Sequence, residues 1–101
     1  MDKDPLLHRI VNVLKMMKII SKENSEGNLR RITPLIKRGN VSSVPIATIE
    51  KEADAISCTV RMISSLNLKE EIAGIGTRKD QMLVITIWVE LEWLMNRIIK
   101  G

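Results

Sequence analysis

The segment from Met82 to Ile99 is apolar on nearly every side, and this feature constrains the fold more than any other in the chain. In a helix that turns by about 100° per residue, apolar residues fill one side: Val84, Ile87, Leu91, Leu94, Met95 and Ile98, with Leu83 and Trp88 at its edges. Met82, Ile85 and Val89 fall outside that side, and Trp93 lies among polar residues. A helix that is apolar on all sides has to be buried on all sides. We therefore expect it to be either the central helix of the 101-residue chain or a helix that covers its second face with another chain.

A β-strand competes with this helix over residues 82–93. Ile85, Ile87 and Val89 alternate with other side chains and are β-branched, a pattern typical of strands. A strand needs a partner, however, and only residues 40–49 have a sequence that resembles one. We therefore predict a helix over about residues 78–99, capped by Thr77 with Asp80 three residues later.

Two further helices are predicted from apolar residues that recur every three or four positions. The first covers about residues 5–21, where Asp4 and Pro5 form a typical helix start. Its apolar side consists of Leu6, Ile10, Val13, Met17 and Ile20. The second covers about residues 45–66, after Ser42 and Ser43, with an apolar side made of Ile46, Ile49, Ala53, Ile56, Val60 and Ile63. This regular spacing predicts a helix that packs along its length against another helix.

The segments between these helices are less regular. Residues 21–28 are polar, contain Gly27 and are predicted to form a loop. Residues 29–40 are predicted to be a broken helical piece, with a short turn from Pro34 to Gly39. A short helix over residues 68–73 is expected before Gly74 and Gly76.

Together these elements predict an all-α fold, a compact bundle of four to five helices in a single domain over residues 1–101. The helices at 45–66 and 78–99 should pack along their length, with the helix at 5–21 across them. The chain has no Phe or Tyr, two Trp and six Met. Its core is therefore expected to be aliphatic, with Met filling irregular gaps.

Groups that could perform catalysis are few. The chain contains one His and one Cys, His8 and Cys58. His8 lies on a polar helix side, and Cys58 is expected to be a buried or half-buried thiol rather than a nucleophile. Two such residues also make a structural zinc site improbable. We predict a non-enzymatic protein with no cofactor and no metal.

Positive charge is concentrated in the first part of the chain. Residues 1–40 hold nine Lys or Arg against four Asp or Glu, a net charge of +5, whereas residues 41–101 hold seven against eight, a net charge of −1. The candidate phosphate-binding residues are Lys15, Lys18 and Lys22, placed on one stripe of the first helix, and Arg30, Arg31, Lys37 and Arg38. They could follow the backbone of an RNA duplex without reading its sequence. A solvated surface that keeps a small protein soluble explains the same charges.

The apolar residues of the last helix support a different function. Met82, Ile85, Val89 and Trp93 could form an interface, because Trp and Met are enriched at interface cores. We therefore favour an interaction module that self-associates and docks a partner protein through this helix. The alternative is sequence-independent RNA binding through the basic residues. The composition, rich in Ile, Lys, Ser and Asn and poor in aromatics, resembles that of small helical regulatory domains of RNA viruses.

The expected location is intracellular, either cytoplasmic or nuclear. The charged start of the chain lacks the apolar region of a signal peptide, and a single Cys fits a reducing compartment. The longest apolar run, Met82 to Val89, is interrupted by Thr86 and is far shorter than the roughly 20 residues that a bilayer requires. No membrane-spanning segment is predicted.

Overall fold

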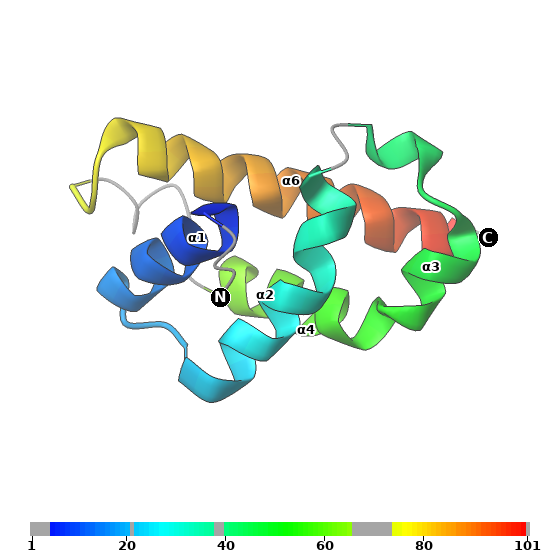
Figure 1. Ribbon diagram of the computed structural model, residues 1–101, viewed down its shortest axis with the longest axis horizontal. Coiled ribbons are helices and arrows are strands. Elements are labelled where there is room, and N and C mark those ends of the chain that lie inside the picture. The colour runs from blue at the N-terminus through cyan, green and yellow to red at the C-terminus, as the bar shows by residue number, and fades with distance from the viewer. Residues whose placement is uncertain (1–4, 21, 38–39, 66–73, 101) are drawn as a thin grey trace.

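The computed structural model describes residues 5–20, 22–37, 40–65 and 74–100, with residues 22–24 described by their backbone alone. Its helices are α1 (Pro5–Met16), α2 (Lys22–Lys37), the 3₁₀ helix η1 (Val41–Ser43), α3 (Ile46–Lys51), α4 (Ala53–Ser64) and α6 (Arg78–Lys100) (Figure 1). The described residues contain no strand. The predicted all-α bundle of four to five helices is therefore confirmed, and so is the helical state of residues 82–93.

Helix α6 is the central element of the fold. It runs along the length of the molecule in Figure 1 and packs against each of the other described α-helices, α1, α2, α3 and α4. The side chains that it buries lie on the predicted inner side: Val84, Ile87, Leu91 and Leu94. Leu83, Trp88, Met95 and Ile98 are partly buried against the same core. The periodicity of the sequence therefore identified the buried side correctly.

The core is aliphatic, as the composition predicts. Its largest fully buried side chains are Ile, Leu and Val residues from each described α-helix, together with Val44 from the segment before α3: Ile10, Val13, Leu14, Leu29, Ile32, Val44, Ile49, Ile56, Ile63, Ile87, Leu91 and Leu94. Trp88 is only half-buried, and its indole Nε1 donates a hydrogen bond to Ser64 Oγ at 3.3 Å. The Cα radius of gyration, 13.0 Å, is about the value expected for a compact domain of 100 residues.

Helix α1 ends earlier than predicted, at Met16 rather than at residue 21. The Lys18 N–H bonds to the Lys15 carbonyl at 2.9 Å, and the Ile19 N–H bonds to the Leu14 carbonyl at 3.4 Å. These two bonds form a Schellman motif, which places Lys18 in the left-handed conformation with φ 56°. Sequence reasoning missed this stop because the position usually holds Gly.

Lys18→Gly is expected to stabilise the protein by about 0.5–1 kcal/mol, because a left-handed backbone strains every residue that has a Cβ. Thermal melting would measure this as a raised Tm. Lys18→Ala is the matched control, since it also removes the charge but keeps the Cβ. Equal melting temperatures for the two variants would contradict the strain at this position.

Helix α2 corrects two predictions. It begins at Lys22, within the predicted loop at 21–28, and it continues through Pro34 instead of starting a new turn there. Its inner side consists of Ser25, Leu29, Ile32 and Leu35, all buried. Pro34 lies in the last turn of α2, on its exposed side. Proline has no N–H to donate to the carbonyl one turn earlier, and at this exposed position water can donate to that carbonyl instead. Burial of one side therefore outweighs the low helix propensity of Gly27 and Pro34.

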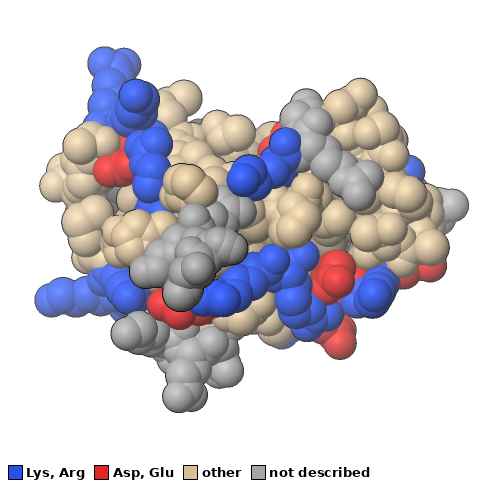
Figure 2. Space-filling view, viewed as in Figure 1, with Lys and Arg blue, Asp and Glu red and all other residues tan. Residues whose placement is uncertain are grey.

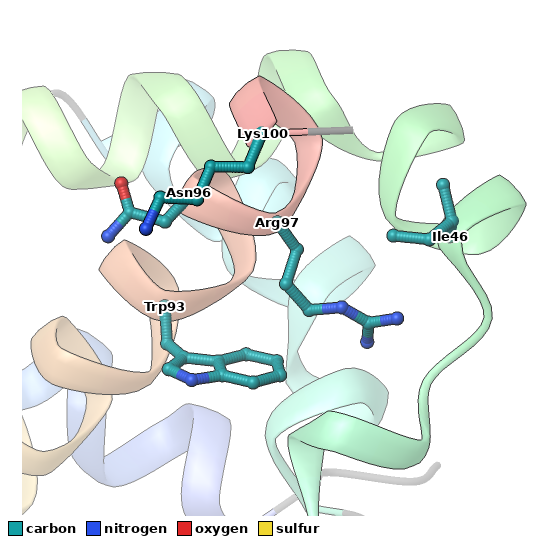
Figure 3. A pocket seen from close by; sticks show the side chains of 5 residues that line it. All are labelled: Ile46, Trp93, Asn96, Arg97 and Lys100. Carbon is teal, nitrogen blue, oxygen red and sulfur yellow. The ribbon is translucent and has the colours of Figure 1, made fainter.

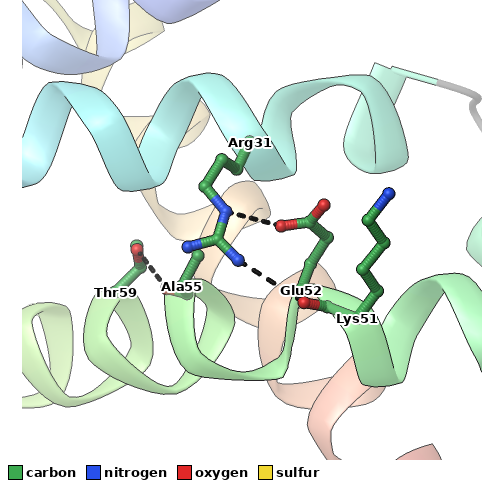
Figure 4. A network of polar contacts seen from close by, with 5 residues as sticks. All are labelled: Arg31, Lys51, Glu52, Ala55 and Thr59. Atoms are coloured by element: carbon green, nitrogen blue, oxygen red, sulfur yellow. Dashed lines mark hydrogen bonds and ion pairs between the residues drawn. The ribbon is translucent and has the colours of Figure 1, made fainter.

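The predicted helix over residues 45–66 is divided into α3 and α4 at Glu52, whose φ and ψ are −101° and 13°. Arg31 of α2 spans the break, as Figure 4 shows: its Nε lies 2.7 Å from Glu52 Oε1, and its Nη2 donates to the Lys51 carbonyl at 3.4 Å. The start also differs, because Pro45 is the N-cap of α3 and makes no side-chain cap bond. As a result, α3 contacts α6 and α4 contacts both α2 and α6.

The start of α6 follows the prediction. Thr77 Oγ1 accepts a hydrogen bond from the Asp80 N–H at 3.1 Å, which caps the helix. Arg9 of α1 lies 2.6 Å from Asp80 Oδ1, and hydrogen bonds from Arg9 and then Thr77 hold the pKa of Asp80 below its ordinary value of 3.8. The predicted helix at 68–73 and the predicted cap Asp4 lie outside the described residues.

Candidate functional site

The four predicted interface residues lie on one side of α6, opposite its buried side. Met82, Val89 and Trp93 are 55%, 54% and 38% exposed, and Ile85 is partly buried. At about 100° per residue, all four point within about 40° of the direction of Val89. We call these four residues the outer stripe. Helix α6 therefore combines a filled inner side with an apolar outer side that the described residues leave largely exposed.

Arg97 holds Trp93 in place. The Arg97 guanidinium carbon lies 5.2 Å from the centre of the Trp93 ring, a cation–π contact. Arg97 Nη1 also donates to the carbonyls of the segment before α3: Val41 at 3.2 Å, Ser42 at 3.3 Å and Val44 at 2.8 Å. Sequence reasoning placed Arg97 only on a polar helix side. Its position four residues after Trp93 was the available signal for the ring contact.

A pocket of about 470 Å³ lies at the C-terminal end of the outer stripe. Trp93, Asn96, Arg97 and Lys100 line it from successive turns of α6, and Ile46 lines it from α3 (Figure 3). Because Trp93 belongs to both the outer stripe and the pocket, the two features form one continuous surface. None of the described residues that line this pocket is acidic.

The structure separates the predicted basic stripe of the first helix. Lys15 lies on α1, Lys18 lies beyond its end and Lys22 begins α2, so the three do not share one helix side. The Lys22 side chain lies outside the described residues. Lys15 Nζ lies 3.7 Å from Glu26 Oε2. The stripe prediction failed because α1 ends at Met16 instead of near residue 21.

The other basic candidates lie on α2, apart from Arg38, which is outside the described residues. Arg30, Arg31 and Lys37 are all exposed, and Arg31 pairs with Glu52. Figure 2 shows Lys and Arg side chains along the lower edge of the molecule with Asp and Glu side chains between them. This surface therefore mixes both signs of charge.

Cys58 is exposed on α4, which corrects the expectation of a buried or half-buried thiol. Arg61 Nη2, one turn later on the same helix, lies 4.0 Å from the Cys58 sulfur. His8 is exposed on α1. Within the described ranges, no three His, Cys, Asp or Glu side chains are grouped as a metal site would require. Nor is any helix in those ranges both long and apolar enough to cross a bilayer.

The candidate site is thus a surface on α6, made of the outer stripe and the adjoining pocket. Its side chains offer apolar area, one aromatic ring and two cationic groups, Arg97 and Lys100. These groups suit recognition of another molecule through packing. Comparison of the chain with protein families, with curated proteins and with solved structures finds no match.

Proposed function

We propose that this protein is a non-enzymatic helical interaction module that self-associates through the outer stripe of α6. One observation carries the proposal: Met82, Val89 and Trp93 are exposed in line on a helix whose opposite side is already filled by the core. The line extends over about 17 Å of the helix. Single exposed apolar side chains are common, but a contiguous row of them is typical of a binding surface.

The size of the outer side suits a weak dimer. Helix α6 has 23 residues and is about 34 Å long, so one side of it can bury on the order of 500 Å² per copy. Specific interfaces bury about 1,200–2,000 Å² in total, and weak ones less. We therefore expect a dissociation constant in the micromolar range. An amphipathic helix of a partner protein would dock on the same stripe.

Trp93→Glu tests the proposal. Loss of a Trp that is buried in an interface costs about 2 kcal/mol or more, so the association constant should fall by roughly 30-fold or more. Sedimentation equilibrium over a wide concentration range measures this constant, and far-UV circular dichroism checks that the helix content is retained. Ile99→Glu is the matched control, because Ile99 is 75% exposed on the same helix but lies outside the outer stripe.

Wild-type protein that stays monomeric at high micromolar concentration would refute self-association and leave a helix of a partner protein as the occupant. If Trp93→Glu loses its helix content, Val89→Glu makes the same test at a side chain that is 54% exposed. Equal weakening by Ile99→Glu would show that the outer stripe is not the interface.

The alternative function, RNA binding, can be tested with the same protein samples. A short RNA duplex added at two salt concentrations should leave the sedimentation of the protein unchanged. If it binds, with a logarithmic salt slope of about −0.9 per phosphate as for B-DNA, the basic residues are responsible. Replacing Lys15, Lys18 and Lys22 together by Gln would then flatten that slope, and Trp93→Glu would not.

A further inference from the structure

The pocket at the end of α6 has the geometry of a packing hole. Trp93, Asn96, Arg97 and Lys100 occupy positions i, i+3, i+4 and i+7 of one helix. Four residues in this arrangement form the hole that receives a side chain from a facing helix in knobs-into-holes packing. Arg97 is fixed by three carbonyls and by the Trp93 ring, so one wall of the hole is already ordered.

A matching side chain protrudes from the same side of the same helix. Met82 is 55% exposed and lies seven residues before Val89, whereas the centre of the hole lies between seven and eight residues after it. Met82 and the centre of the hole are therefore each about 11 Å from Val89 along the helix, and both point within about 30° of the direction of Val89. Val89 is also the midpoint of α6, which begins at Arg78 and ends at Lys100.

We propose that two copies of the chain pair their α6 helices antiparallel about a two-fold axis at Val89, with Met82 of each copy in the pocket of the other. This arrangement rests on the proposed self-association and specifies its geometry. A two-fold interface is self-complementary, so one axis fills both pockets at once. The flexible thioether of Met suits an irregular hole and makes favourable contacts with an aromatic edge, here that of Trp93.

The available area favours this register. An axis at the midpoint lets the two helices overlap over their full length, and this overlap is what brings the buried total to about 1,000 Å², near the minimum for a specific interface. The residues from Met82 to Val89 carry no charge, and Glu92, which points about 60° away from the direction of Val89, lies at the rim of the interface rather than on its axis. The same axis places Arg78 opposite Lys100 of the other copy, so the two ends of the interface bring like charges together and the gain comes from the apolar contacts between them.

A charge exchange tests the contact in solution. Met82→Lys would add a further cation beside Arg97 and Lys100 of the other copy, so self-association should fall by at least about tenfold, the equivalent of 1.4 kcal/mol. Adding Lys100→Glu to that variant should restore most of the loss. The two positions are 18 residues apart, about 27 Å within one copy, so rescue has to occur between copies. Sedimentation equilibrium of both variants, with Lys100→Glu alone as the control, gives the answer.

Cross-linking tests the register directly. In a Cys58→Ser background, equal amounts of Met82→Cys chains and tagged Asn96→Cys chains are mixed and oxidised. The mixed disulfide should be the main product, in excess of random pairing. Met82→Cys alone should stay uncross-linked, because its two copies would be about 21 Å apart along the helix, whereas a disulfide requires Cα atoms within about 7 Å.

The outcomes separate the two proposals. Wild-type protein that dimerises while Met82→Cys links to itself would establish a parallel pair and overturn this arrangement, with self-association intact. Dimerisation without rescue by Lys100→Glu and without the mixed disulfide would place the interface elsewhere. Wild-type protein that is monomeric would overturn both proposals.

Discussion

Leu91→Ala is expected to destabilise the protein by about 2–5 kcal/mol, the cost of removing buried methyl groups and leaving a cavity. Leu91 is fully buried on the inner side of α6, the helix that packs against all the other described α-helices. A protein of this kind has a total stability of about 5–15 kcal/mol. A large fraction of the free energy of unfolding should therefore be lost. Urea denaturation followed by circular dichroism measures the change.

Two controls accompany Leu91→Ala. Ile99→Ala changes an exposed residue of the same helix and should alter the stability by less than about 0.5 kcal/mol. Leu91→Met keeps the side-chain volume and should cost less than about 1.5 kcal/mol. If Leu91→Ala were as stable as Ile99→Ala, the inner side of α6 would not be the core of this fold.

Arg97→Met should destabilise the protein by about 2 kcal/mol, the second largest effect that we expect. The substitution keeps a long side chain with good helix propensity. It removes the charged donor shared by the carbonyls of Val41, Ser42 and Val44, where hydrogen bonds to a charged group contribute about 1.5–3 kcal/mol. It also removes the contact with the Trp93 ring, which contributes about 0.5–1 kcal/mol at an exposed site.

Arg97→Lys is the matched control, because Lys keeps the charge but cannot present the planar fork of donors. Its stability should fall between those of the wild type and Arg97→Met. Trp93→Leu leaves Trp88 as the remaining Trp, so the fluorescence of that variant gives the Trp88 contribution to be subtracted. The Trp93 fluorescence anisotropy obtained in this way should be lower in Arg97→Met, because the indole is no longer held by the guanidinium. Unchanged urea denaturation in Arg97→Met would show that the segment before α3 is held by its own packing.

The sides of the helices that face the core could be predicted because they depend on local geometry. Residues three and four apart lie on the same side of any helix, so the spacing of Ile10, Ile56 and Leu91 indicated which side of each helix would be buried. The same reasoning identified Met82, Ile85, Val89 and Trp93 as residues left over once the core was filled. Their location on one side of α6 needs no knowledge of the other helices.

The ends of the helices were decided by tertiary structure. Lys18 adopts a conformation that its residue type disfavours, and α2 continues through Pro34. In each case packing of the buried residues outweighs a local preference of about 1–3 kcal/mol. Glu52 interrupts a faultless apolar spacing at the point where Arg31 of another helix reaches it, and no periodicity within residues 45–66 contains that contact.

The pocket also depends on tertiary structure. The outer stripe follows from the order of residues in α6 alone. The hole at its end is completed by Ile46, and its wall is ordered by bonds between Arg97 and carbonyls more than fifty residues earlier. Sequence therefore determines which side chains a helix turns outward, because that depends on the helix alone. Folding decides which of them meet a preformed hole, because a hole requires the neighbouring chain segments to be in place.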